Sequence, residues 1–174
     1  INGVEIFAEG EWNGDNYTLE DMDLLVEAFR KTKDYLKPYL KLGHSKKQKL
    51  LESDEMPAAG WISGLYRRGK KLVADFTGVP RKIYDLIKSG GYRRVSSEIF
   101  VNIKVQGETY PLALKAVALL GGETPAVECL DDIHALYAVG AAVRAYESGN
   151  STRTLDFDPV LDKEVSGMTL DEAV

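Results

Sequence analysis

The sequence predicts an α+β domain organised around a curled or closed, barrel-like β-sheet with surrounding helices. Several short segments alternate apolar and polar residues, which is typical of strands, and three others repeat apolar residues at helical spacing. The chain has 174 residues, 44% of them hydrophobic, which suits a single domain with its own core. We expect this domain over residues 1–146 and a polar linker or tail over residues 147–174.

The first elements are a strand, a loop and a helix. Residues 4–8 have the composition of a short strand, and residues 10–16 are rich in turn formers. Thr18 is a good N-cap, so a helix is expected to start there. Pro38 disfavours helical backbone just before it, so this helix should not continue beyond Leu36.

A short extended segment and a hairpin come next. Residues 39–44 form an extended piece that ends at His44, and the polar residues 45–55 indicate an exposed loop. Residues 60–66 and 71–77 have strand character, and the turn between them contains a glycine. They therefore predict a β-hairpin.

The last elements are two helices and two longer strands. Pro80 opens a helix that runs through Lys88 and ends at a Gly-Gly pair. A long strand over residues 92–105 and an apolar strand over 112–120 follow. A third helix is expected over residues 131–146.

The alternation along residues 92–105 assigns its side chains to two faces. One face is apolar and should meet the core: Val95, Ser97, Ile99, Val101, Ile103 and Val105. The other face is mostly polar: Ser96, Glu98, Phe100, Asn102 and Lys104. Ser96 is therefore expected where a substrate could reach it, whereas Ser97 should point into the apolar layer.

Composition argues against several classes of partner and cofactor. The net charge is −5, and the basic residues of the middle third are scattered without an aromatic platform, so we expect no nucleic-acid partner. No apolar run approaches the ~20 residues that cross a bilayer, so we expect no membrane partner. Two histidines and one cysteine do not make a persuasive zinc site, and no nucleotide-binding glycine motif is present. We expect no metal and no cofactor.

What remains is the chemistry of a serine and a histidine. A serine hydroxyl is a poor nucleophile until a neighbouring base takes its proton, and histidine titrates in the right range. Ser96 and His44 are the candidates, although the residues alone pair them only weakly.

Three segments carry a resemblance that strengthens this pairing. Leu42-Gly43-His44, Pro57-Ala58-Ala59-Gly60-Trp61 and Tyr92-Arg93-Arg94-Val95-Ser96-Ser97-Glu98 together resemble the Mu-like phage protease/scaffold family. That family is related to other prohead serine proteases and to the herpesvirus assembly protease. The resemblance covers roughly residues 4–140, and it implies the fold of those proteases.

The resemblance implies that Ser96 is the nucleophile and His44 its general base. Ser97 is the alternative nucleophile, but both the match and the face of the strand favour Ser96. The third catalytic residue is open: Asp75 is the first candidate, Glu98 and Glu123 are alternatives, and a dyad without a third member is possible.

The same resemblance points to groups that would contact the substrate. Gly121 and Gly122 follow the 112–120 strand, about where the herpesvirus relatives have an oxyanion loop, although a simple turn explains them equally well. Arg93 and Arg94 precede the nucleophile and are candidates for binding the substrate, Arg94 first; the alternative for at least one of them is a solvent-facing role.

The resemblance implies a serine endopeptidase that processes scaffold and capsid proteins, including itself, during phage procapsid maturation. Its partners would be scaffold and major capsid proteins as substrates, with self-association inside the assembling procapsid in the host cytoplasm. The alternative is a non-catalytic scaffold or capsid-binding module with the same fold.

Overall fold

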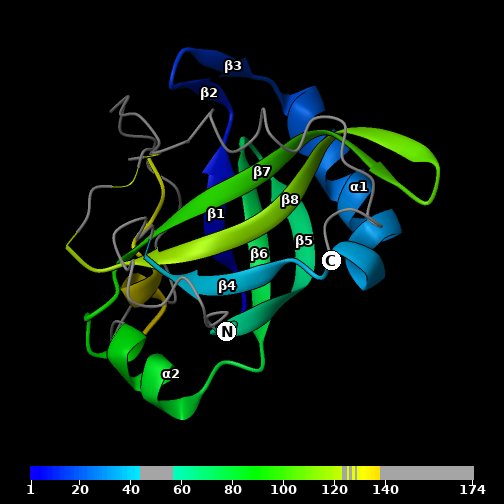
Figure 1. Ribbon diagram of the computed structural model, residues 1–174. Helices are drawn as coiled ribbons and strands as arrows, with labels where there is room; N and C mark the ends of the chain where they lie inside the picture. Colours follow the sequence, from blue (N-terminus) through cyan, green and yellow to red (C-terminus); the bar gives the residue numbers. More distant parts are fainter. Residues whose placement is uncertain (44–56, 123–124, 126, 128, 138–174) are drawn as a thin grey trace.

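In the residues that the structure describes, the protein is α+β, with a strongly curled half-barrel sheet and two α-helices (Figure 1). The computed structural model describes residues 1–43, 57–122, 125, 127 and 129–137. Six strands form the main sheet in the order β1-β6-β5-β4-β8-β7. This confirms the α+β class and the curled sheet. The expected tail over 147–174 lies outside the described residues.

The strands of the main sheet lie at the segments that the sequence pattern predicts, except that β8 begins at Glu108 rather than at residue 112. Their bounds are β1 Val4–Ala8, β4 Tyr39–Leu42, β5 Gly60–Arg68, β6 Lys71–Thr77, β7 Arg94–Val105 and β8 Glu108–Leu120. All neighbours are antiparallel except β4 and β8, which run parallel. The last pair, β7 and β8, is a long hairpin that crosses the front of the half-barrel in Figure 1.

A small hairpin replaces the loop expected over residues 10–16. Strands β2 (Gly10–Trp12) and β3 (Asp15–Tyr17) pair antiparallel across Asn13 and Gly14. Both turn residues have positive φ, 52° and 86°. Asn-Gly with this backbone is the preferred two-residue hairpin turn, so the sequence did carry the signal.

Both helices begin and end as their flanking residues dictate. Helix α1 (Leu19–Leu36) starts with a capping box between Thr18 and Asp21, and ends at Lys37 in the left-handed conformation just before Pro38. Helix α2 spans Arg81–Lys88, directly after Pro80. The third helix expected over residues 131–146 is described only as the short 3₁₀ helix η2, Ile133–Tyr137, and residues 138–146 lie outside the described part.

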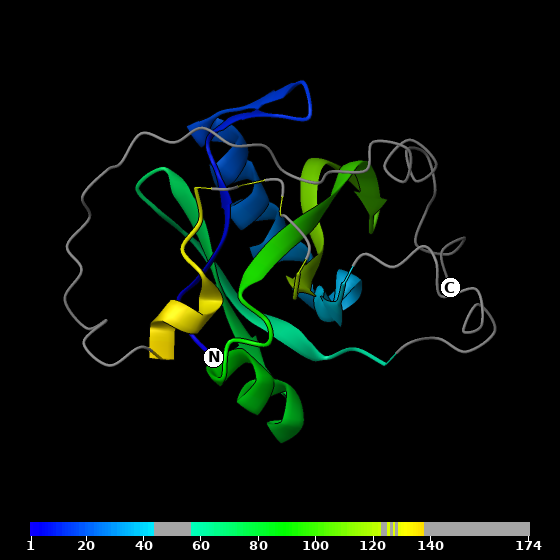
Figure 2. The same ribbon diagram turned by 90° about the vertical axis from the view of Figure 1, so that its left-hand side faces the viewer.

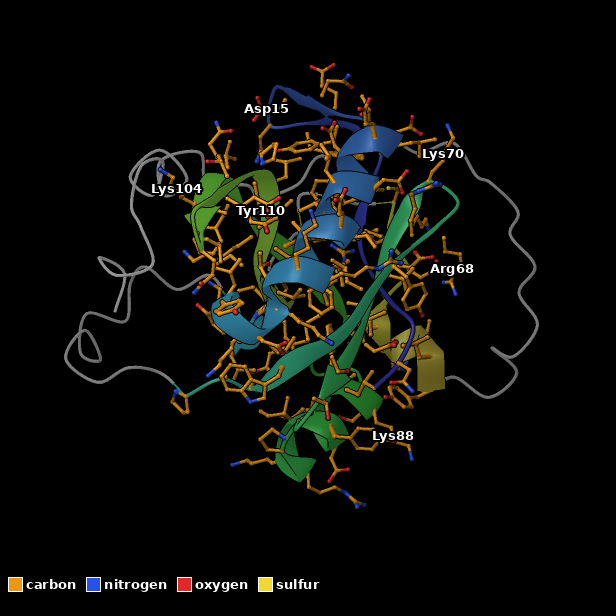
Figure 3. The ribbon with its side chains drawn as sticks, turned by 90° about the vertical axis from the view of Figure 1, so that its right-hand side faces the viewer. Asp15, Arg68, Lys70, Lys88, Lys104 and Tyr110 are labelled. Atoms are coloured by element: carbon orange, nitrogen blue, oxygen red, sulfur yellow. The ribbon has the colours of Figure 1, made fainter. Side chains whose placement is uncertain are left out.

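The core lies inside the curl of the sheet. Helix α1 packs against β8 and β5, as Figure 3 shows from its side. On the opposite side, where β1 and β7 are the two edges of the sheet, η2 lies alongside β1 and near α2 (Figure 2). Two backbone amides hold the segment that leads into η2. Asp131 N–H donates to Glu5 Oε2 at 2.9 Å, and Ile133 N–H donates to Arg93 O at 2.8 Å.

Within the described residues, neither helix combines the length and the apolar character that crossing a membrane would require.

Candidate functional site

Ser96 lies on the face of β7 that points away from the core. It pairs with Ala118 on β8, and Ala118 pairs with Lys41 on β4. Directly opposed residues of neighbouring strands share a face, so these three side chains project from the same side of the sheet.

The next row projects to the other side. Val95 pairs with Leu119, which pairs with Leu42. Val95 and Leu119 belong to the hydrophobic core, and Leu42 packs against it. The sequence prediction that Ser96 and Val95 occupy opposite faces is confirmed.

The accessibility expected for Ser96 is wrong, because its side chain is 0% exposed. Its neighbours on the same face, Ala116 and Ala118, are also fully buried. The reason is visible in β8, where the unbroken apolar run over residues 116–120 is buried throughout. Such a run is typical of a strand covered on both faces, whereas alternation indicates a strand with one wet face. Apolar and polar residues alternate along β7, but its neighbour β8 is apolar without alternation over residues 116–120.

Ser97 has a structural partner. The residue is 2% exposed, and its hydroxyl donates a 2.7 Å hydrogen bond to the carbonyl oxygen of Ile6 on β1. Ile6 lies at the register shift between Glu5 and Phe7, where β1 has one more residue than β6. The Ser97 hydroxyl therefore serves the carbonyl of a bulge residue. This engagement disfavours Ser97 as the alternative nucleophile.

Two of the predicted catalytic residues, His44 and Glu123, lie outside the described residues. The residue before His44 is described. The amide of Gly43 donates a 2.9 Å hydrogen bond to Leu119 O, and its φ of 66° turns the chain at the end of β4. β4 therefore runs beside β8 up to the residue that precedes His44.

Asp75, the first candidate for the third catalytic residue, forms a hydrogen bond with the N-terminal segment. Its Oδ1 accepts a 2.8 Å hydrogen bond from the amide of Gly3, which fastens the N-terminal segment to β6. A Cβ on Gly64, its cross-strand neighbour, would lie 2.8 Å from Asp75 Oδ2, so this glycine makes room for the carboxylate. In the sheet, β5, β4 and β8 lie between β6 and β7. These positions give Asp75 a structural role at the start of the chain.

Glu98, an alternative third residue, shares the face of Ser96 and is bound by two lysines. Lys41 forms an ion pair with Glu98 Oε1 across β8, and Lys115 Nζ lies 3.9 Å from Glu98 Oε2. Tyr39 lies in the same row as Glu98, with Ala116 between them. Burial, and next the charge of Glu98, raise the pKa of the Tyr39 hydroxyl above its ordinary value. Sequence reasoning missed Lys41 and Tyr39, because their nearness to Glu98 depends on the parallel pairing of β4 with β8. It missed Lys115 because this residue is the extra one in a bulge of β8 opposite Glu98.

The expected oxyanion glycines follow β8 directly. Gly121 and Gly122 are exposed, and neither has a left-handed φ. A Cβ on Gly122 would meet nothing within 4 Å, and one on Gly121 would make only an ordinary contact with Gly91 O at 3.4 Å. Local backbone and packing therefore do not require glycine at either position. Close approach of another molecule to these amides is a further reason for glycine, so the oxyanion prediction stays open beside the simple turn.

Arg94 lies two residues before Ser96, in a small hollow. Its Nε is 4.0 Å from Asp132 Oδ1, and Arg93 Nε is 3.9 Å from Asp132 Oδ2. The hollow has a volume of ≈ 60 Å³ and is lined by Arg94, Val95, Pro125, Val127, Leu130, Asp131 and Asp132. Its size suits a water-sized or small polar group rather than a whole ligand.

Among the residues that the structure describes, no group of three His, Cys, Asp or Glu side chains could hold a metal ion. Comparison with known proteins finds no family model, no curated protein and no solved structure that matches the chain.

Proposed function

We propose that the protein is a serine endopeptidase with the prohead and herpesvirus protease type of fold. Ser96 would be its nucleophile and His44 its general base. The observation that carries the proposal is that β4 and β7 lie on either side of the same strand, β8. β7, which bears Ser96, and β4, which ends just before His44, both pair with residues 116–119 of β8. Sheet strands lie about 4.8 Å apart, so the backbones of β4 and β7 are about 10 Å apart across β8.

The reaction would follow the usual course for a serine nucleophile. His44 takes the proton from Ser96 Oγ as the oxygen bonds to the scissile carbonyl carbon. The peptide C–N bond then breaks, and the leaving amine receives that proton. Water adds to the resulting ester with His44 again as base, the acyl–oxygen bond breaks, and Ser96 regains its proton. The amides of Gly121 and Gly122 are our candidates for stabilising the oxyanion.

The proposed substrates are scaffold and capsid proteins, including the chain itself, cleaved inside an assembling phage procapsid in the host cytoplasm. This part of the proposal rests on the sequence resemblance. Self-association inside the procapsid belongs to the same proposal.

The burial of Ser96 favours a second candidate function. With its side chain 0% exposed, no carbonyl carbon can reach Oγ until the groups over it move. A non-catalytic scaffold or capsid-binding module with the same fold would not need that movement. The two functions therefore differ in whether Ser96 reacts in the folded protein.

A fluorophosphonate probe tests this difference, because it forms a covalent bond only with an activated serine. We expect the wild-type protein to gain one adduct by intact-mass measurement and peptide mapping to place it on Ser96. Ser96→Ala should gain none, and Ser97→Ala, assayed well below its melting temperature, should still react. The same variants in a longer precursor should give matching results for trimming.

An adduct on Ser97 would keep the reaction class and refute the nucleophile. If the wild-type protein takes up no probe and its precursor persists intact in assembling particles, the scaffold module is the correct function.

A further inference from the structure

We propose that the site selects peptides with an acidic residue near the scissile bond, through the ammonium groups of Lys41 and Lys115 beside Ser96. This inference rests on the proposed function and names the substrate class for it. It begins from an imbalance of charge. Both lysines contact a single carboxylate, that of Glu98, so this cluster keeps one positive charge that Glu98 does not offset.

The cluster lies next to Ser96 on the same face. Lys41 occupies the same row as Ser96, and Glu98 follows two residues later on β7, about 6.5–7 Å away along the strand. The intervening β8 residues, Ala116 and Ala118, carry only methyl side chains, so the long Lys41 side chain crosses β8 to reach Glu98.

A bulge directs Lys115 to the same place. Glu98 pairs with Ala116 while Ile99 pairs with Leu114, so Lys115 is the extra residue on β8. A bulge re-aims its side chain, and such features are frequent next to active sites. The Lys115 ammonium also lies 5.5 Å from the ring centre of Phe100, which helps to hold its position.

The two ammonium groups are reachable, unlike Ser96 itself. The side chains of Lys41 and Lys115 are 28% and 25% exposed, and that of Glu98 is 18% exposed. An extended peptide running along β7 over Ser96 places every second side chain on one face. A residue two positions from the scissile bond would then lie over Glu98 and its two lysines, where a carboxylate offsets the unbalanced charge.

The opposite flank of Ser96 does not offer the same charge. There Arg93 and Arg94 both face Asp132, and Asp131 lines the same hollow as Arg94. Among the described residues of this flank, two acids accompany two bases, so these residues offer no net charge to attract an acidic residue. The preference is therefore expected on one side of the scissile bond only.

The test is to digest a proteome-derived peptide library and to identify residues around each cleaved bond by mass spectrometry. The wild-type protein should enrich Asp and Glu two positions from the scissile bond, on one side only. Lys41→Gln and Lys115→Gln should each reduce the enrichment about two- to fivefold, the range of a partly exposed ion pair. Raising the salt to 1 M should also weaken it.

Lys104→Gln is the matched control. Lys104 lies on β7, the strand that bears Ser96, and is exposed; Figure 3 shows it at the outer end of the β7–β8 hairpin. The Lys104→Gln change removes one positive charge, as the two test changes do, and should leave the enrichment of acidic residues unchanged.

The outcomes separate this inference from the proposed function. Cleavage without acidic enrichment, or enrichment that survives both lysine changes, overturns the inference and leaves the endopeptidase intact. A library that stays uncut although the fluorophosphonate reacts with Ser96 also overturns it. If neither cleavage nor labelling occurs, the proposed function fails as well.

Discussion

Replacing Ser97 by alanine tests the structural role of the second serine. The change removes the hydroxyl of a residue that is 2% exposed, and this hydroxyl donates a 2.7 Å hydrogen bond to Ile6 O. Ile6 is itself fully buried and is the bulge residue of β1, so water cannot replace the lost donor without disturbing the core.

The expected cost follows from the carbonyl that loses its donor. Leaving a buried polar group without this partner costs about 1–3 kcal/mol of the free energy of unfolding. For a chain of this size each kcal/mol corresponds to about 2–4 °C, so the melting temperature should fall by roughly 2–12 °C.

Urea unfolding of Ser97→Ala and the wild-type protein measures this cost. The midpoint should fall while the m-value stays the same, because the fold is kept and only its stability changes. Ser63→Ala is the matched control: Ser63 also donates to a backbone carbonyl, that of Asp75 at 3.2 Å, but at an exposed position. It should change stability by no more than about 0.5 kcal/mol. Equal midpoints for Ser97→Ala and wild type would refute the bulge argument.

Two further predictions concern α1 and its contact with the long hairpin. Thr18→Ala should destabilise the protein by about 1 kcal/mol in urea unfolding, because it removes the hydroxyl that caps the Asp21 amide; an unchanged midpoint would mean that the capping box contributes nothing. The Tyr110 hydroxyl, and next Lys31, hold the pKa of Glu108 below its ordinary 4.5, so the stabilisation is present above that pH and is lost as the pH falls. The melting temperature of Glu108→Gln should therefore drop less between pH 7 and pH 3 than that of the wild type, and equal drops would contradict this (Tyr110 is labelled in Figure 3).

The strands and helices could be predicted because their signals are local. Alternation identified β7, and the Thr18 cap with Pro38 fixed the ends of α1. The β2–β3 hairpin was missed although Asn13-Gly14 is a strong local turn signal, because the segment was interpreted only as rich in turn formers.

The surroundings of Ser96 could not be predicted from local patterns. They depend on the parallel pairing of β4 with β8, which joins residues about 77 positions apart in the sequence. Without that register, nothing brings Lys41 to Glu98. The bulge at Lys115 is a further obstacle, because one extra residue reverses the face assignment of everything beyond it.

The burial of Ser96 had a signal that a single-strand analysis overlooks. Alternation on β7 predicted a wet outer face, but exposure depends on the neighbouring strand as well. The apolar run over residues 116–120 indicates that β8 is covered on both faces, and Ser96 is paired within that run. The alternation on β7 and the apolar run on β8 together predict that Ser96 lies on the outer face of the sheet and is buried there.

Contacts on both faces of β7 hold the strand next to Ser96, the proposed nucleophile. On the inner face, Ser97 binds the bulge residue of β1, Ile6, and on the outer face Glu98 binds the bulge residue of β8, Lys115. These contacts, at the two residues that follow Ser96, hold the adjoining backbone of β7 in one position, which is what the proposed nucleophile requires. If Ser96 is the nucleophile, as proposed, a substrate would not be admitted by bending β7, because bending would break these contacts next to Ser96. Access would then require movement of the groups that cover Ser96, so variants of Ser97 should alter stability without exposing Ser96 in the folded state.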